Sequence, residues 1–91
     1  MAELDLLEAY LKDKGVPYSR TESQIIVYDR RGRCIWDAVC SYGSYGYEQG
    51  LLEVMGDPVV RWSDGDSVAG YLTAQNVIDR WEESRNAGIS Y

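Results

Sequence analysis

The sequence predicts a single α+β domain over residues 1–91, with a mostly antiparallel sheet of two hairpins and three helices in the order α-β-β-α-β-β-α. Three observations lead to this prediction. Three segments repeat apolar residues at helical spacing, two others join β-branched and aromatic residues to a turn signal, and none resembles a linker. With 91 residues and 45% hydrophobic content, the chain is long enough for one modest core.

The first helix is expected in "ELDLLEAYLKDKG", residues 3–15. Its apolar stripe consists of Leu4, Leu7, Tyr10 and Leu11. Acidic residues stand at its start and lysines at its end, which the helix dipole favours. Gly15 suits a left-handed cap, and Pro17 follows where the helix cannot continue.

The segment "QIIVYDRRGRCIWDAVC", residues 24–40, predicts a hairpin with a type I turn and a glycine bulge at residues 29–32. That turn would pair Tyr28 with Cys34 and continue without interruption along both strands. One face of the hairpin would then hold Ile25, Val27, Ile35 and Val39, and the other Ile26, Tyr28, Trp36 and Ala38. Because both faces are largely apolar, we expect both to be covered at least in part.

Two cysteines, Cys34 and Cys40, fall on the second strand of this hairpin. Six residues of strand at roughly 3.3 Å each place them about 20 Å apart. A disulfide requires Cα atoms within about 7 Å, so both thiols are expected to be free, as in a reducing compartment.

The middle of the chain predicts a second helix, preceded by a loop rich in tyrosine and glycine. The apolar positions of this helix are Tyr47, Leu51, Val54 and Met55. Ser44 is a candidate N-cap and Gly56 stands where a helix should stop. Tyr47 is therefore expected in the core, while Tyr42 and Tyr45 are expected in the loop ahead of the helix.

The remaining segments predict a second hairpin and a final helix. "PVVRWSDGDSVAGYL", residues 58–72, places Asp64 and Gly65 at a two-residue turn. Thr73 would cap a helix that ends near residues 86–88. The apolar stripe of that helix consists of Ala74, Val77, Ile78 and Trp81.

The residue inventory disfavours an enzyme. The chain has no histidine, which removes the commonest general base and most zinc sites, and two cysteines cannot supply a zinc site of four thiolates. We therefore expect no metal and no cofactor. A carboxylate enzyme could use Asp37, which alternation places on the face of Ile35 and Val39. A half-buried carboxylate bonded to an arginine or a backbone amide is the favoured interpretation.

Charge and length define the expected surroundings of the protein. Nine basic residues stand against fifteen acidic ones, and residues 36–72 hold six of the acids with Arg61 as their only base. Such a charge disfavours direct binding to nucleic acid and favours a basic protein, including a nucleic-acid-binding nuclease. It could equally serve solubility alone. Without a signal peptide or an apolar span, a cytoplasmic location away from membranes is expected.

The tyrosine- and glycine-rich segment is the best candidate for a binding site. Tyrosine offers a large contact area at low entropic cost, and glycine lets the backbone approach a partner. The candidate residues, with the acids that would form a rim, are Tyr42, Tyr45, Glu48, Glu53, Asp57, Asp64 and Asp66. The alternative is that the two tyrosines only roof a small core that lacks phenylalanine.

The stretches "WDAVCSYGSYGYEQGLLEVMGD" and "DGDSVAGYLTAQNVIDRW" resemble small uncharacterised proteins of phages and conjugative elements of Gram-positive bacteria. The resemblance brings no catalytic residues. It implies a setting in which small acidic proteins disarm host defence, as anti-CRISPR and anti-restriction proteins do. The expected function is therefore a non-enzymatic inhibitor that binds a basic nucleic-acid-handling host protein. The alternative is a regulatory or accessory domain that self-associates, as a homodimer for example.

Overall fold

The computed structural model describes residues 2–56 and 68–86 of the chain. The elements are α1 (Glu3–Asp13), β1 (Tyr18–Arg20), β2 (Gln24–Tyr28), β3 (Cys34–Val39), the short 3-10 helix η1 (Tyr47–Gln49), β4 (Leu52–Met55), β5 (Val68–Leu72) and α2 (Ala74–Asn86). Within the described residues, five strands form one antiparallel sheet in chain order, from β1 at one edge to β5 at the other. The α+β class is confirmed, but the predicted arrangement of three helices and two hairpins is wrong.

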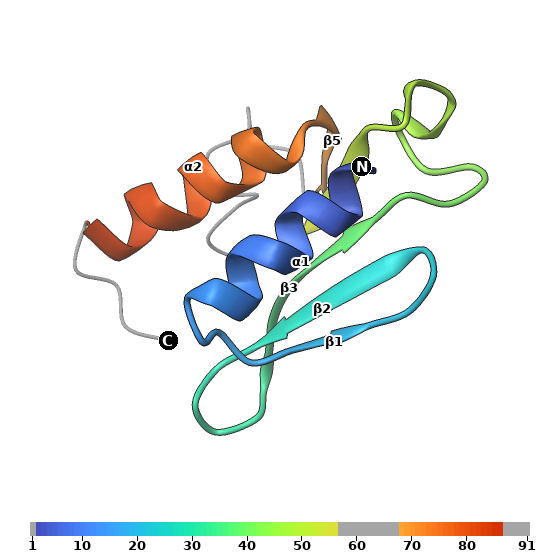
Figure 1. Ribbon diagram of the computed structural model, residues 1–91. Coiled ribbons are helices and arrows are strands. Elements are labelled where there is room, and N and C mark those ends of the chain that lie inside the picture. Colours follow the sequence, from blue (N-terminus) through green and yellow to red (C-terminus); the bar gives the residue numbers. More distant parts are fainter. Residues whose placement is uncertain (1, 57–67, 87–91) are drawn as a thin grey trace.

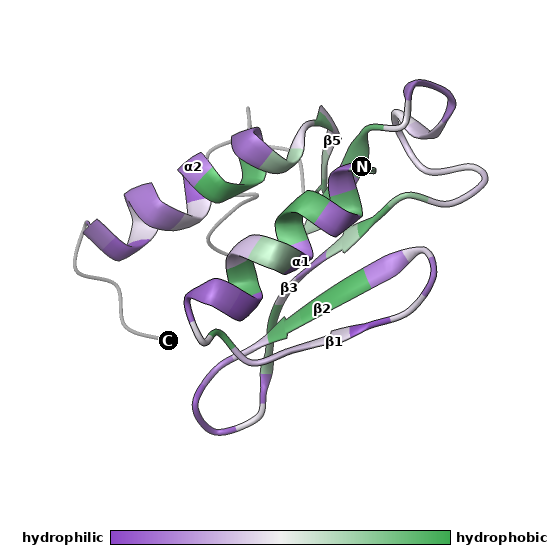
Figure 2. Ribbon diagram, in the orientation of Figure 1, coloured by the Kyte–Doolittle hydropathy of each residue, from purple (hydrophilic) through white to green (hydrophobic). Residues whose placement is uncertain are grey.

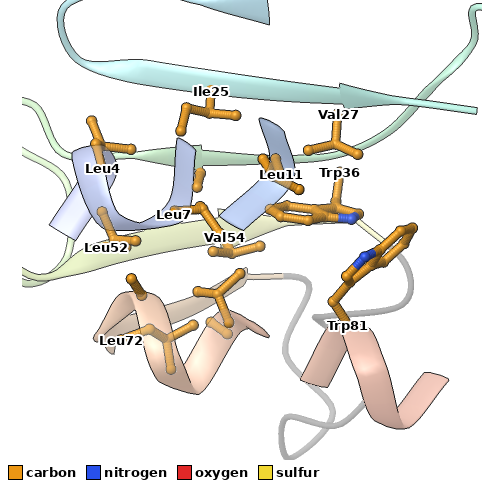
Figure 3. Packing of buried hydrophobic residues seen from close by; sticks show 14 residues of the cluster. Leu4, Leu7, Leu11, Ile25, Val27, Trp36, Leu52, Val54, Leu72 and Trp81 are labelled. Carbon is orange, nitrogen blue, oxygen red and sulfur yellow. The ribbon is translucent and has the colours of Figure 1, made fainter. Parts of the chain in front are cut away.

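Both α-helices lie on the same face of the sheet (Figure 1), and the core fills the space between the two layers. The buried apolar residues are Leu4, Leu7, Leu11, Ile25, Val27, Trp36, Ala38, Leu52, Val54, Ala69, Leu72, Ala74, Val77 and Trp81. Figure 3 shows Trp36 of β3 and Trp81 of α2 meeting at one end of this cluster, with ring centroids 5.8 Å apart. The burial of Trp81 that its place on the helical stripe predicts is confirmed.

The ends of the two helices follow the sequence signals. Lys14 is the C-cap of α1, and Gly15 follows with a φ of +68°, as expected of a left-handed cap. At the start of α2, the N–H of Asn76 donates to Thr73 Oγ1 over 3.1 Å, and the N–H of Thr73 donates to Asn76 Oδ1 over 3.0 Å. This reciprocal pair satisfies N–H groups that a helix start would leave without acceptors.

Polar contacts also join the two helices at both ends. Glu3 of α1 accepts a 2.7 Å hydrogen bond from the N–H of Ala74, the first residue of α2. At the other end, the Tyr10 hydroxyl donates to Glu82 over 2.6 Å. Burial and then this hydrogen bond raise the pKa of Tyr10 above its usual value. In Figure 2 the hydrophobic residues of the helices are most prominent in α1, whereas α2 is largely hydrophilic beyond its first turns.

The register of the β2–β3 hairpin differs from the prediction by one residue. Tyr28 does pair with Cys34, but a bulge follows, so Val27 pairs with Trp36 rather than with Ile35. The shift reverses which residues of β3 face the helices, since side chains alternate along a strand. The predicted sharing of a face by Ile35, Val39, Ile25 and Val27 is therefore wrong. The bulge places the largest side chain of β3 in the core.

The predicted second helix is also wrong, because its residues form η1 and β4 instead. Gly46 and Gly50 flank η1 in the left-handed conformation, with φ of 94° and 71°, which prevents the helix from extending. Leu52 and Val54 are both buried at the two-residue period of a strand, and β4 pairs with β3. Tyr47, expected in the core, is 43% exposed.

Two further differences concern the edges of the sheet. The strand β1 was not expected, and it is only three residues long. The strand β5 pairs with β4, for example through Leu52 and Leu72, whereas the residues of β4 were expected in a helix. The turn predicted at Asp64 and Gly65, together with the first strand of the second hairpin, lies outside the described residues.

Candidate functional site

The connection between β3 and β4, residues 40–51, forms the candidate site and is called the tyrosine loop below. It projects beyond the sheet at the end opposite the β2–β3 turn, at the upper right of Figure 1. Figure 2 shows that this projection is not hydrophobic by residue type, since its ribbon is pale or purple. Any affinity of the loop must therefore come from aromatic rings with polar tips rather than from aliphatic side chains.

Hydrogen bonds within the loop fix its first part. The N–H and the hydroxyl of Ser44 both donate to the Ser41 carbonyl, over 2.8 and 2.7 Å. The same hydroxyl accepts from the Ser41 N–H over 3.1 Å. Between the two serines, Gly43 adopts a φ of +89°. The loop ahead of η1 is thus a closed turn with its own bonding.

The second part of the loop depends on Gly46. Its carbonyl accepts hydrogen bonds from the N–H groups of Gln49 and Leu51, over 3.1 and 2.9 Å. A Cβ added at this glycine would lie 2.9 Å from Leu51 Cβ and 3.1 Å from Tyr71 Cα. Glycine is therefore required here both by its positive φ and by the close approach of β5.

Three contacts with the neighbouring strands anchor Tyr45. Its N–H donates to Glu53 Oε2 of β4 over 2.6 Å. Its side chain lies against Gly70 of β5, where an added Cβ would come within 2.5 Å of Tyr45 Cβ. Its carbonyl accepts a long hydrogen bond of 3.4 Å from the N–H of Tyr71. Glu53, predicted as part of an acidic rim, thus holds the loop in place.

Four tyrosines gather on this framework, and together they are called the tyrosine surface: Tyr42, Tyr45, Tyr47 and Tyr71. The rings of Tyr45 and Tyr71 stack with an interplanar angle of 30° and centroids 6.4 Å apart. The rings of Tyr42 and Tyr47 meet edge to face, 6.2 Å apart. The exposed fractions of the four residues are 93% for Tyr42, 60% for Tyr45, 43% for Tyr47 and 58% for Tyr71. Between them lies a hollow of about 430 Å³ that Glu48 and Gln49 also line.

Sequence reasoning missed Tyr71. It is the one described non-glycine residue with a positive φ, at 58°, in a strand where residues are normally extended. Residues held in such a conformation cost free energy and concentrate at functional sites. The signal in the sequence was Gly70, because a glycine inside a strand marks a bulge or the close approach of another segment.

The predicted site residues thus divide into three groups. The structure brings Tyr42, Tyr45 and Glu48 together at the hollow. It uses Glu53 as an anchor, half-buried beside them. The remaining three acids, Asp57, Asp64 and Asp66, lie outside the described residues.

In the described part of the chain, the other candidate residues, Asp37 and the two cysteines, do not come together in a catalytic or metal-binding site. Asp37 is half-buried as expected, but its partner is the side chain of Gln24, whose Nε2 donates to it over 2.8 Å. Cys34 and Cys40 are both free thiols. Within residues 2–56 and 68–86, no cluster of three or more cysteine, aspartate or glutamate side chains is arranged to hold a metal ion. Neither described helix has the length and apolar character needed to cross a membrane.

The tyrosine surface is therefore a preformed, exposed and aromatic feature with a carboxylate at its border. Comparison of the chain with protein-family models, with curated proteins and with solved structures found no match.

Proposed function

We propose that this protein is a non-enzymatic interaction protein that binds a basic partner protein through the tyrosine surface. The observation that carries the proposal is the exposure of four tyrosines, three on a loop whose backbone is held by hydrogen bonds and the fourth, Tyr71, on the adjoining strand β5. Ordering a flexible loop costs binding free energy, so a fixed loop retains more of the energy of its contacts. Tyrosines are also enriched where partners bury rigid anchors.

Charge supports a basic partner. The chain carries a net charge of −6, and the described tyrosine loop holds Glu48 but no lysine or arginine. Opposite charges accelerate encounter and select partners more than they add affinity. Proteins that handle nucleic acid present basic surfaces of this kind. Inhibition of such a protein, in the manner of small inhibitors from mobile elements, is the specific form of the proposal.

The test is capture of partners from a bacterial lysate at rising salt concentration. We expect basic proteins to be retained by the wild-type protein near 0.1 M salt and lost near 1 M, where the Debye length falls from about 10 to about 3 Å. Tyr42→Ala and Tyr45→Ala should weaken capture. The matched control is Tyr28→Ala, which removes a tyrosine from the distant end of β2.

Charge reversal gives a second control pair for the same experiment. Glu48→Lys at the hollow should slow association with a captured partner, whereas Glu83→Lys on the exposed side of α2 should change it less. If both reversals slow association equally, the net charge of the protein, and not the position of Glu48 at the hollow, would explain the effect. Capture that is indifferent to Tyr42 and Tyr45 would contradict the proposal.

A second candidate function, self-association, has its own supporting observation. Neither α-helix covers the second face of the sheet (Figure 1). The apolar residues on that face are Ile26, Val39, Met55 and Val68. Met55 is 49% exposed. A dimer that sizing shows to be resistant to salt, and that Met55→Lys dissociates, would favour this function over the first.

A further inference from the structure

The chemistry of the hollow is more specific than a general contact surface. Its described lining contains four tyrosine rings, the Glu48 carboxylate and the Gln49 amide, and no lysine or arginine. The face of an aromatic ring carries negative potential and attracts cations. Carboxylate and ring faces therefore favour the same kind of ligand, one with a positive charge.

The geometry of the rings favours a flat cation. Tyr45 and Tyr71 are inclined to each other by only 30°, and each keeps more than half of its surface exposed. A guanidinium group is planar, is weakly hydrated and stacks on aromatic faces, whereas an ammonium group is a compact and strongly hydrated charge. Two similarly oriented rings thus offer more to arginine than to lysine.

The framework keeps this pair of rings in position. Gly70 lets the Tyr45 side chain approach β5, and Tyr71 adopts its left-handed conformation beside it. The glutamate anchor on Tyr45 fixes the other side of the pair. The rings are consequently oriented before any ligand arrives, so that a cation binds without first ordering them.

We infer that the hollow receives the guanidinium group of an arginine side chain on the partner, stacked on the Tyr45–Tyr71 pair with Glu48 as its counter-charge. This inference rests on the proposed function and defines the partner further, as a protein with an exposed arginine at the centre of its basic surface. Arginine is also the basic residue that most often anchors protein interfaces.

The test is a nuclear magnetic resonance titration of the ¹⁵N-labelled protein with N-acetyl-arginine amide at constant ionic strength. We expect saturable shifts of the backbone amides of residues 42–49 and 71. N-acetyl-citrulline amide, a neutral molecule of nearly the same shape, should cause none. The corresponding lysine compound should bind more weakly than the arginine compound.

Variants separate the ring from the hydroxyl. Tyr71→Leu removes the aromatic face and should weaken binding of the arginine compound by about two- to five-fold, the range of one exposed cation–π contact. Tyr71→Phe keeps the ring and should bind like the wild type. Glu48→Gln should also weaken binding, and Tyr28→Leu, remote from the hollow, should not. A correct fold of each variant is checked in the same spectra.

Each outcome decides the inference. Three results would overturn it. They are an absence of saturable shifts at the loop, equal affinities for the arginine and lysine compounds, and an affinity of Tyr71→Leu for the arginine compound equal to that of the wild type. In any of these cases, a protein partner whose capture still depends on Tyr42 and Tyr45 would leave the proposed function intact. Conversely, the arginine compound could bind while Tyr42→Ala and Tyr45→Ala capture as much partner protein as the wild type. That result would contradict the proposed function and leave the arginine site in place.

Discussion

The two connections at the ends of β3 are built on different principles. In the β2–β3 turn, Asp29 Oδ1 accepts hydrogen bonds from the N–H groups of Arg31 and Arg33, over 2.8 and 2.9 Å. Every bond of that network lies within five consecutive residues. The tyrosine loop at the other end is held by Glu53 of β4 and by the backbone of β5.

Their glycines show the same contrast. Gly32 in the turn has a φ of +82° and no atom within 4 Å of an added Cβ, so only its backbone conformation calls for glycine. Gly46 in the tyrosine loop has a similar φ of +94° but also faces Leu51 and Tyr71 at contact distance. A turn that is complete in itself can be read from local sequence, whereas a loop completed by distant strands cannot.

The largest effect should come from the strand that joins the two connections. Trp36→Ala removes the largest fully buried side chain of β3 and should lower the free energy of unfolding by about 3–5 kcal/mol. Urea denaturation measures this loss. Its control is Val39→Ala, on the other face of the same strand, which should cost clearly less. Equal costs would mean that the bulge does not select which residue is buried.

The next effect tests the dependence of the tyrosine loop on β5. Gly43→Ala and Gly46→Ala both force alanine into the left-handed region, at a cost of about 1–2 kcal/mol each. Gly46→Ala should cost about 1–3 kcal/mol more, because its Cβ would crowd Leu51 and Tyr71. Thermal unfolding of the pair gives the difference. Identical melting temperatures would show that the loop does not rely on this contact.

The turn should respond to pH through Asp29. The hydrogen bond from the Arg33 N–H, and then that from Arg31 with the nearby arginine charges, lower the pKa of this carboxyl despite partial desolvation. Because the folded pKa is below the unfolded one, its stabilisation is complete above about pH 4 and is lost as pH falls through the folded pKa. Carboxyl ¹³C titration should find the lowered pKa. Asp29→Asn should reduce the acid sensitivity of unfolding.

The smallest effect concerns the tyrosine surface itself. Tyr42 is 93% exposed, so Tyr42→Ala should change stability by no more than about 0.5 kcal/mol. The contrast with Gly46→Ala would separate the surface of the loop from its framework. A large loss of stability on Tyr42→Ala, seen in a melting curve, would instead make Tyr42 part of the core.

Much of the fold was accessible from local patterns. The stripe of α1, the Gly15 cap, the Thr73 cap and the burial of Trp81 all depend on residues within a few positions of one another. A three- to four-residue apolar period predicts a helix and its buried face, and a capping residue predicts where the helix begins or ends. The β2–β3 turn belongs to the same class.

The errors arose where distant residues decide. Val54 and Met55 fit a helical period by coincidence, and pairing with β3 overrides that period. The bulge next to Tyr28 has no local signature, although it changes the face of every residue beyond it. At the site, Tyr42 and Tyr45 could be anticipated from composition. Gly70 signalled that another segment approaches this strand, but it did not identify Tyr71, which only the folded sheet brings to the loop.

The left-handed backbone at Tyr71 has a consequence for the sheet as a whole. In the described sheet β5 is an edge strand, and an edge strand with a regular backbone is a template for a strand of another molecule. A residue turned out of the extended conformation interrupts the row of donors and acceptors that such a template needs. The left-handed conformation that places the Tyr71 ring beside the Tyr45 ring therefore also disfavours aggregation through this edge.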